Sequence, residues 1–253
     1  MRLSALPAFA DNYIWVLRDP RRALLVDPGE AGPVLAAADQ GLEPAAILLT
    51  HHHPDHCAGV PALRERWPRL PVFAPDDARI ELDCERVGDG ASLQLLGHGV
   101  QVIAVPGHTR SHVAYLVDGH LFCGDTLFSL GCGRMFEGTP AQMHASLQRL
   151  AALPGGTRVC CGHEYTLANA AFALEVDPDN TSLAARRIEA RHQREAGMPT
   201  LPTTLASERA CNPFLRCDAP AVREAAARRR GRAPADEIET FATLRSWKDG
   251  FRA

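Results

Sequence analysis

The chain has 253 residues, of which 46% are hydrophobic and 23% are charged, and its formal net charge is −3. This length suits one large domain, or one domain with a smaller appendage, and the apolar content is too high for an intrinsically disordered chain. The slightly negative charge excludes binding of nucleic acid through an overall positive charge. No apolar run approaches about 18 residues, so no membrane-spanning helix is expected. Pro7 and Asp11 interrupt the N-terminal stretch before a signal-peptide core is complete.

Three residue counts are informative. The chain has 11 histidines, and Lys248 is its single lysine among 27 basic residues. Its eight cysteines are scattered and form no Cys-x-x-Cys pair. Such a pattern favours reduced thiols over a disulfide framework, so we expect a cytoplasmic protein.

Residues 1–165 alternate between short strands and short helices. Strands bounded by Pro, Gly and Asp are predicted at 13–17, 23–26, 46–49, 72–74, 92–96, 100–105, 113–117, 121–123 and 158–160. Helical spacing is found at 31–40, 60–66 and 141–153. Tight turns such as Asp118-Gly119 join neighbouring strands into hairpins, so we expect mixed sheets.

After Tyr165 the strand signals disappear, and helices are predicted at about 166–176, 180–196, 219–229 and 234–249. The charge changes as well, from 13 basic and 18 acidic residues up to position 165 to 14 basic and 12 acidic residues beyond it. We therefore predict two domains: an α/β domain over residues 1–165 and a helical domain over residues 166–253.

The strongest functional signal is the segment THHHPDH at residues 50–56, which directly follows a predicted strand. Functional side chains are common in such strand-end loops. His51 and His53 are two residues apart, so both rings project to one side of an extended loop, and Asp55 and His56 follow where a helix can begin. Imidazole and carboxylate are suitable ligands for Zn²⁺, Fe or Mn²⁺. The alternative interpretation is a surface cluster of histidines that binds nothing.

Three more potential ligands, His108, Asp125 and His163, each stand just after a predicted strand and close to a glycine that permits a sharp turn. Together the four loops provide five histidines and two aspartates. Seven ligands are too many for one tetrahedral ion and suit two ions that share a bridging group. We expect His52 and His112 to support the ligands from behind, and the other histidines to be structural or exposed.

This array resembles the signature of the metallo-β-lactamase superfamily over roughly residues 10–165. The resemblance implies an α+β fold, an αββα sandwich with a dinuclear site at the sheet edge. It implies that one ion is held by His51, His53 and His108, and the other by Asp55, His56 and His163. Asp125 is expected to bridge the ions, and Asp55 and Asp125 are expected to be the catalytic carboxylates. Two divalent ions, Zn²⁺ in preference to Fe or Mn²⁺, would provide a bridging hydroxide as nucleophile and stabilise an oxyanion.

Further segments narrow the resemblance to the glyoxalase II (hydroxyacylglutathione hydrolase) family. These are Asp11–Trp15, Gly124–Thr139, Cys161–Thr166, Pro199–Leu205, Asn212–Arg216 and Leu244–Phe251. The resemblance runs nearly end to end and implies a C-terminal α-helical domain that binds substrate. The implied reaction is hydrolysis of the thioester S-D-lactoylglutathione to glutathione and D-lactate.

The same resemblance implies that Arg134, Tyr165, Arg245 and Lys248 contact the glutathione part of the substrate. Glutathione carries two carboxylates, and an arginine can grip a carboxylate with two hydrogen bonds. Arg245 and Lys248 are three residues apart in a predicted helix and share one face. By spacing alone, that face is equally typical of a solvated helix.

Two positions depart from the family pattern. Phe136 stands where some members have a tyrosine that contacts substrate, and its loss of a hydroxyl removes a hydrogen bond worth about 1 kcal/mol. Ser111 stands where a glycine is common, so we expect slightly different loop geometry or support there. Cys132 matches the family, and we interpret it as a packing residue.

Two other functions remain open from the sequence. A persulfide dioxygenase with one iron would not need Asp55, His56 and His163. A metal-dependent RNA-binding module would have a structural site, and such sites usually close four ligands, often cysteines. We expect a small-molecule thioester as the only partner, no nucleic acid or membrane, and a monomer.

Overall fold

The computed structural model describes residues 1–252, which form two compact units. The first contains Met1–Ala104, Ser111–Gly124 and Cys160–His163, and the second contains Val105–Arg110, Asp125–Val159 and the chain from Glu164 onward. Because both units are discontinuous in sequence, the division into domains 1–165 and 166–253 stays a prediction. Within the described residues, none of the helices has the length and apolar character needed to span a bilayer.

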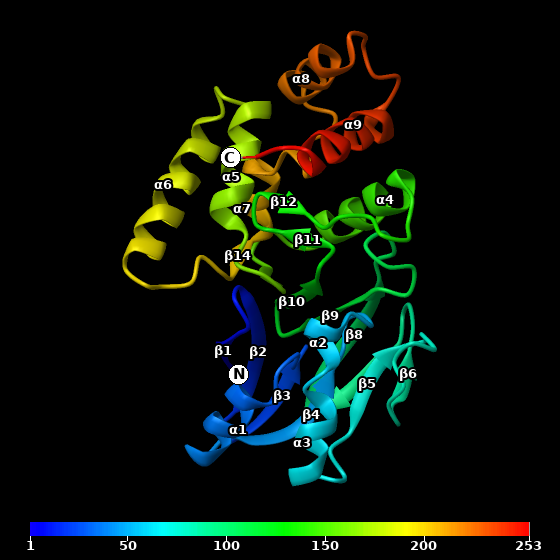
Figure 1. The fold of residues 1–253 in the computed structure, drawn as a ribbon, viewed down its shortest axis with the longest axis vertical. Helices are drawn as coiled ribbons and strands as arrows, with labels where there is room; N and C mark the ends of the chain where they lie inside the picture. Colours follow the sequence, from blue (N-terminus) through cyan, green and yellow to red (C-terminus); the bar gives the residue numbers. More distant parts are fainter. Residues whose placement is uncertain (253) are drawn as a thin grey trace. The chain divides into compact units, whose positions relative to one another are not determined.

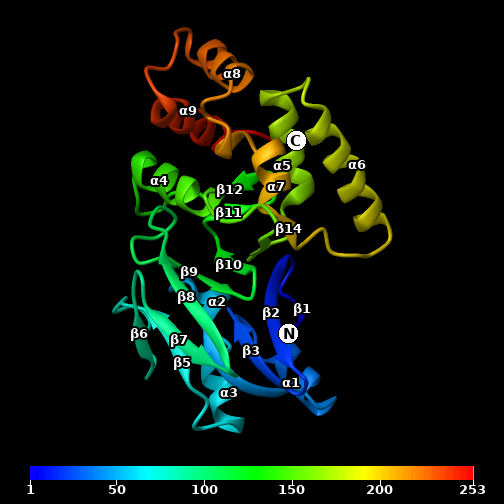
Figure 2. The ribbon, with the colours of Figure 1, turned by 180° about the vertical axis from the view of Figure 1, so that it is seen from behind.

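The first unit is built on two sheets (Figures 1 and 2). Sheet one has the order β1-β2-β3-β4-β5-β6, in which β1, β2 and β3 are antiparallel and β3 to β6 are parallel. Its strands are Arg2–Ala8, Asn12–Asp19, Arg22–Val26, Glu43–Leu48, Val72–Pro75 and Glu85–Val87.

Sheet two is antiparallel from β7 through β10, and β13 lies beside β10. These strands are Ser92–Leu95, His98–Ala104, Val113–Val117, His120–Gly124 and Arg158–Cys161. The first residues of β13, which belong to the second unit, pair with the short strand β14 (Thr203–Thr204).

The two sheets of the first unit are tied by buried side chains. The Tyr115 hydroxyl in sheet two donates to the Leu49 carbonyl at 2.9 Å, and the Trp15 indole in sheet one donates to the Cys161 carbonyl at 2.9 Å. Helices α1 (Gly32–Asp39) and α3 (Val60–Arg66) add their apolar residues to the core cluster of sheet one. The short helix α2 (Pro54–Cys57) falls in the histidine-rich segment.

The second unit is mainly helical. Its helices are α4 (Pro140–Ala151), α5 (Thr166–Val176), α6 (Thr181–Glu195), α7 (Leu205–Cys211), η1 (Pro213–Leu215), α8 (Pro220–Arg230) and α9 (Glu237–Asp249). A hairpin of two short strands, β11 (Leu127–Phe128) and β12 (Gly131–Cys132), accompanies them. Aromatic rings join the helices: Phe172 of α5 stacks on Phe214 at 5.9 Å and meets Trp247 of α9 edge-on at 5.4 Å.

The α+β class predicted from the sequence is confirmed. The predicted strand at 113–117 and the helices at 60–66 and 166–176 have the predicted bounds. The expectation that strands end at Tyr165 was wrong, because two β-branched residues, Thr203 and Thr204, pair with β13. Strand β1 was missed because Pro7 and the polar start of the chain obscure its alternation. All eight cysteines are free thiols, as expected.

Candidate metal centre and substrate pocket

The histidine-rich segment gathers four of the predicted ligands in the first unit. Beyond the end of β4 the chain runs extended through His53, and Pro54 starts helix α2. The Nε2 atom of His51 lies 3.0 Å from Nδ1 of His53. These two rings therefore point to one place, as their spacing predicted. Asp55 and His56 lie in the single turn of α2, with His56 Nε2 3.5 Å from the Asp55 carboxylate.

His163 joins this group from the end of β13. Its Nε2 atom lies 3.4 Å from the Asp55 carboxylate, and its ring centroid is 5.4 Å from that of His56. Asp55, His56 and His163 offer ligand atoms that all lie within 4.8 Å of one another. Three of the ligands predicted for one ion are thus assembled within the first unit.

The outer nitrogens of these imidazoles are fixed by carboxylates. His163 Nδ1 lies 2.8 Å from Asp11, and His56 Nδ1 lies 3.0 Å from Asp27. An Nδ1–H that donates to a carboxylate leaves the Nε2 lone pair available, which is the usual arrangement behind a metal-bound histidine. The donor chemistry of the loop therefore fits divalent ions.

Asp27 is a further potential metal ligand, because its carboxylate and the ring nitrogens of His51 and His56 all lie within 4.8 Å of one another. However, that carboxylate already accepts the Thr50 amide at 2.8 Å and the Thr50 hydroxyl at 2.7 Å. We therefore interpret Asp27 as a support for the loop. Sequence analysis missed both Asp11 and Asp27. The Asp-Pro-Gly turn after β3, where Asp27 has a φ of 53°, was the available signal.

The remaining two predicted ligands, His108 and Asp125, lie in the second unit. His108 Nδ1 is 2.8 Å from the Arg134 carbonyl, and its Nε2 is 3.6 Å from the Asp125 carboxylate. Gly133 is required beside them, since a Cβ there would come 1.9 Å from the Asp125 carbonyl. The turn after β12 thus brings backbone close against this pair, and His108 is again anchored through Nδ1.

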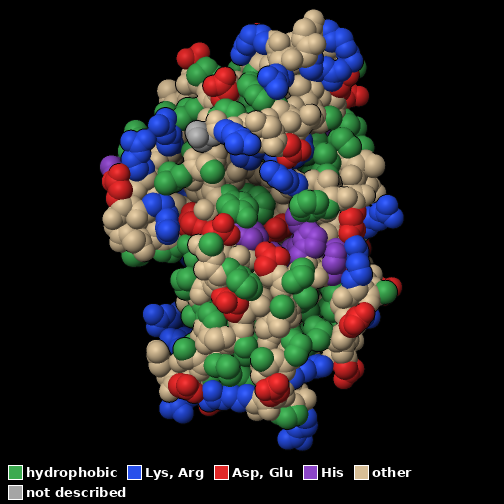
Figure 3. Space-filling view, in the orientation of Figure 1, with side chains coloured by type: hydrophobic (Ala, Val, Ile, Leu, Met, Phe, Trp, Pro, Cys, Tyr) green, Lys and Arg blue, Asp and Glu red, His purple; other side chains and the backbone are tan. Residues whose placement is uncertain are grey.

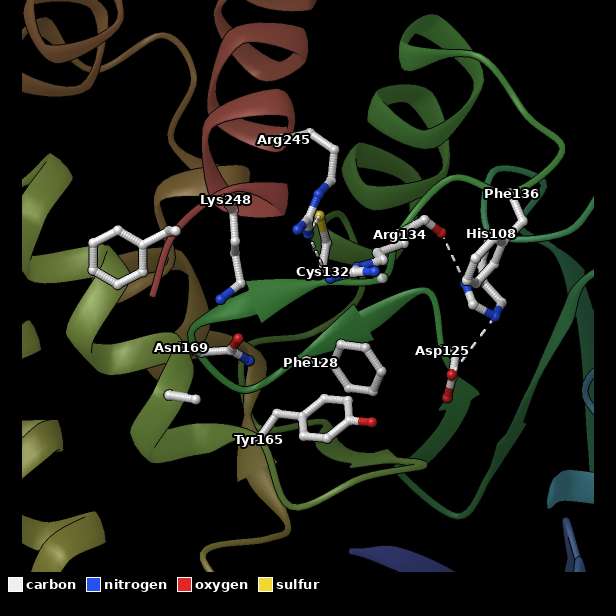
Figure 4. Close-up of a pocket in the computed structure, with 13 residues that line it drawn as sticks. His108, Asp125, Phe128, Cys132, Arg134, Phe136, Tyr165, Asn169, Arg245 and Lys248 are labelled. Carbon is white, nitrogen blue, oxygen red and sulfur yellow. Dashed lines mark hydrogen bonds and ion pairs between the residues drawn. The ribbon is translucent and has the colours of Figure 1, made fainter. Parts of the chain in front are cut away.

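A cavity of about 430 Å³ opens beside this pair in the second unit (Figure 4). The His108–Asp125 pair lines this cavity. So do all four residues expected to bind substrate, namely Arg134, Tyr165, Arg245 and Lys248. The rings of Phe128 and Tyr165 meet edge-on at 5.2 Å and form an apolar wall. Basic groups and potential metal ligands therefore share one cavity.

The two basic residues of α9 differ in their surroundings (Figure 4). The Arg245 guanidinium is only 3% exposed and donates to the Cys132 carbonyl at 2.7 Å and to Asp249 at 3.0 Å. Lys248 extends into the cavity toward Asn169, and burial together with the nearby charge of Arg245 lowers its pKa from 10.5 to about 8. Arg245 thus fixes the hairpin strand β12, and Lys248 presents a cation to the cavity.

The departures from the family pattern are also visible. The Phe136 ring is 63% exposed and lies edge-on to His108 at 5.2 Å. Ser111 donates to the Asp77 carboxylate at 2.5 Å, and hydrogen bonds from Arg79 and Ser111 hold the pKa of Asp77 well below its usual range. His52 Nδ1 lies 3.5 Å from the same carboxylate. Ser111 therefore ties the loop before β9 to the loop after β5.

Two other expectations concern residues near these groups. The His112 ring stacks on His51 at 4.7 Å, which is consistent with support from behind. Cys132 is buried, and burial raises the pKa of its thiol. A thiol that resists ionisation is a poor nucleophile, in agreement with a packing role.

Comparison with known proteins gives two family matches that together span most of the chain. Residues 9–163 match the metallo-beta-lactamase superfamily, and residues 164–251 match the hydroxyacylglutathione hydrolase C-terminus. A hydroxyacylglutathione hydrolase of Xanthomonas axonopodis pv. citri (strain 306) is 63% identical over 255 residues, covering all of both chains. One from Xylella fastidiosa (strain M23) is 62% identical over 252 residues, 99% of this chain and 98% of its own. The chain belongs to the hydroxyacylglutathione hydrolase family.

Two solved structures have a fold similar to that of this chain. The BLEG-1 B3 metallo-beta-lactamase superposes with a TM-score of 0.63 at 24% identity, over 85% of this chain and 99% of its own. ETHE1 from Myxococcus xanthus superposes with a TM-score of 0.59 at 29% identity, over 83% of this chain and 99% of its own. The predicted metallo-β-lactamase sandwich with a C-terminal helical domain is confirmed.

Proposed function

We propose that the chain hydrolyses S-D-lactoylglutathione and related 2-hydroxyacylglutathione thioesters to glutathione and the free hydroxy acid. Full-length relatives at 62% and 63% identity carry the name hydroxyacylglutathione hydrolase. The observation that carries the proposal is the cavity of the second unit, in which the His108–Asp125 pair and the basic residues Arg134 and Lys248 face the same space. A thioester with anionic ends needs both kinds of group.

The proposed metal site uses seven residues in two sets. His51, His53 and His108 would hold one ion, Asp55, His56 and His163 would hold the second, and Asp125 would be shared by both. Support comes from the family signature and from the fixed Nδ1 atoms of His56, His108 and His163. Ligands of mixed nitrogen and oxygen character accept several metals, and we propose Zn²⁺ ahead of Fe or Mn²⁺. When bound, two such ions polarise a carbonyl oxygen and make hydroxide available at neutral pH.

The residues of the cavity orient the thioester. Lys248 and Arg134 provide positive charge for the carboxylates of the glutathione part, and Arg245 holds β12 so that Arg134 follows in a fixed turn. Phe128 and Tyr165 give the substrate an aromatic surface to pack against. Asp11 and Asp27 fix the orientation of the His163 and His56 rings through their Nδ1 atoms, which turns Nε2 toward the proposed ions.

The alternatives expected from the sequence find no support. Asp55, His56 and His163 are assembled as a complete group, which a one-iron dioxygenase would not require. The two curated relatives described above both carry the name of a hydrolase. A monomeric state and a cytoplasmic location stay predictions.

The test is thiol release from S-D-lactoylglutathione by the purified, metal-loaded protein, combined with metal analysis. We expect turnover with two divalent ions per chain. The variant His56→Ala should lose turnover and bound metal. The matched control His98→Ala, whose ring pairs with Asp118 on sheet two, should keep both. A protein that binds two ions and releases no thiol from this substrate contradicts the proposal.

A further inference from the structure

A buried carboxylate in the second unit has no part in the proposed metal site or in the lining of the cavity. Basic side chains gather at the surface over α8 and α9 (Figure 3), whereas Glu208 of α7 is completely buried. Its partners are neutral donors: the Leu130 amide at 2.7 Å, the Ser129 hydroxyl at 3.1 Å and the Asn212 side-chain amide at 3.1 Å. Burial of a carboxylate is costly, so a position that served packing alone would suit an apolar side chain better. The groups that donate to Glu208 therefore indicate its role.

These hydrogen bonds converge on the turn between β11 and β12. Asn212 is also completely buried, and its side-chain amide donates to the carbonyls of Phe128 at 3.1 Å and Gly131 at 2.9 Å. Leu130, in the middle of the turn, has a φ of 60°, a left-handed conformation that leucine rarely adopts. A strained conformation persists only where its surroundings hold it, and the hydrogen bond from the Leu130 amide to Glu208 does so here.

The segment that leaves this turn carries the contacts that fix the His108–Asp125 pair. Directly after β12, the Gly133 amide donates to the Thr126 carbonyl at 3.2 Å, and its backbone lies against Asp125. The Arg134 carbonyl follows, and His108 Nδ1 lies 2.8 Å from it. Because a carbonyl only accepts, Nδ1 carries the hydrogen, and Nε2 faces the Asp125 carboxylate at 3.6 Å. The position of the turn therefore determines where the anchor of the His108 ring lies.

We propose that Glu208 and Asn212 form a clamp, a pair of positioning residues that fixes the turn at residues 128–131 and, through it, the ring of His108. The inference rests on the proposed function, because His108 matters here as a proposed metal ligand. Helix α7 thus contributes to metal affinity although it holds none of the proposed ligands. The clamp acts through hydrogen-bond geometry and needs no negative charge, since all its donors are neutral.

Competition between the full-length protein and a chelator for Zn²⁺ tests the clamp, because it gives the affinities of the two ions in turn. Glu208→Leu keeps the volume of the side chain and removes its acceptor atoms. Glu208→Gln is the conservative variant: its carbonyl can accept from the Leu130 amide, and its amide group can donate to the Ser129 hydroxyl. The matched control is Asp177→Leu, which removes another buried carboxylate of the second unit, one that pairs with Arg216 instead of the turn.

We expect Glu208→Leu to weaken the binding of one ion by about tenfold, the size of effect typical of residues that support a metal ligand. The other ion should be affected less, since Asp55, His56 and His163 remain in place. Glu208→Gln should restore both affinities. Asp177→Leu should lower the melting temperature and leave both affinities unchanged, which separates a positioning role from general destabilisation.

Three results overturn the proposal: a folded Glu208→Leu protein that keeps both affinities, a Glu208→Gln protein that loses as much as Glu208→Leu, or an equal loss in Asp177→Leu. If Glu208→Leu does not fold, Ser129→Ala removes a single hydrogen bond of the clamp and should weaken the same ion by about threefold. An unchanged affinity in Ser129→Ala then overturns the proposal. Failure of the proposed function is seen separately, as no thiol release by the unsubstituted protein with two ions bound.

Discussion

The loop at residues 50–56 and the cavity of the second unit are both rich in polar groups, but the chain builds them differently. Four of the proposed ligands lie within six residues of the loop, where His51 lies close to His53 and Asp55 close to His56. The cavity takes Arg134, Tyr165 and Lys248 from three separate segments. A compact sequence motif therefore describes the loop, whereas only the folded helical unit defines the cavity.

The supports of the two regions differ as well. Behind the loop, the carboxylates of Asp11 and Asp27 hold the imidazoles. Beside the cavity, backbone carbonyls take this role: the Arg134 carbonyl holds His108, and the Cys132 carbonyl holds Arg245. A carboxylate strengthens the imidazole as a metal ligand, while a carbonyl mainly fixes direction. Substitutions in the loop should therefore act on metal content, and substitutions of Arg134 or Lys248 in the cavity on substrate affinity.

The largest expected effect is that of Asp55→Asn. Asp55 is the carboxylate that both His56 and His163 face, so its replacement removes the charge on which their site depends. We expect kcat/KM for the thioester to fall by about a thousandfold, equivalent to about 4 kcal/mol. Metal analysis should show that about one of two ions is lost. Asp83→Asn is the control, since the Asp83 side chain is fully exposed and should leave both quantities unchanged.

A smaller effect is expected for Asp27→Asn, which tests the support behind the loop. An asparagine tolerates the φ of 53° at this position and still accepts the Thr50 amide, so the fold is preserved. It no longer offers a carboxylate to His56 Nδ1. Replacement of such a support typically costs 10- to 100-fold in metal affinity, by order of magnitude.

Competition with a chelator measures the Asp27→Asn effect. The fall in metal affinity should be accompanied by an unchanged KM in the fully loaded variant. If instead KM rises and metal affinity stays constant, then the loop affects substrate affinity, and the assignment of metal binding to the loop and substrate binding to the cavity is wrong. Asp19→Asn, at the end of β2, provides a control aspartate whose side chain is outside the loop.

The contrast between loop and cavity also explains which residues and elements could be predicted from the sequence alone. The sequence alone named all seven residues of the proposed metal site, because each follows a strand in a short, distinctive motif. Asp11 and Asp27 were missed because an aspartate in a turn is common, and its role depends on a partner distant in sequence. For α9, the spacing placed Arg245 and Lys248 on one face. It could not show that the Arg245 guanidinium donates a hydrogen bond to the Cys132 carbonyl. Helix α7 escaped prediction because it is short and lies between Pro-rich segments.

The pH dependence of substrate affinity tests the cavity. Lys248 binds a carboxylate only as the ammonium form, and its pKa in the free protein is lowered to about 8. KM should therefore be constant below this value and rise as the pH increases through it, by about tenfold for each further unit. Lys248→Arg keeps its charge, so its KM should not rise over the range from pH 7 to 9 or so. The measurement is KM from steady-state kinetics across this pH range, with metal content checked at each pH. A rise in KM that persists in Lys248→Arg assigns the titration to another group.

The smallest expected effect belongs to Phe136, whose exposed ring lies against His108 at the cavity. Phe136→Tyr adds a hydroxyl at the ring edge without changing the packing on His108. A hydrogen bond to bound substrate is worth about 1 kcal/mol, so KM for glutathione thioesters should fall about fivefold with kcat and metal content unchanged. Phe136→Leu is the matched control, because it keeps an apolar side chain and cannot gain the hydrogen bond. If both variants change kcat and leave KM constant, Phe136 acts through the His108 ring. It then belongs with the residues that support the metal site and not with those that set substrate affinity.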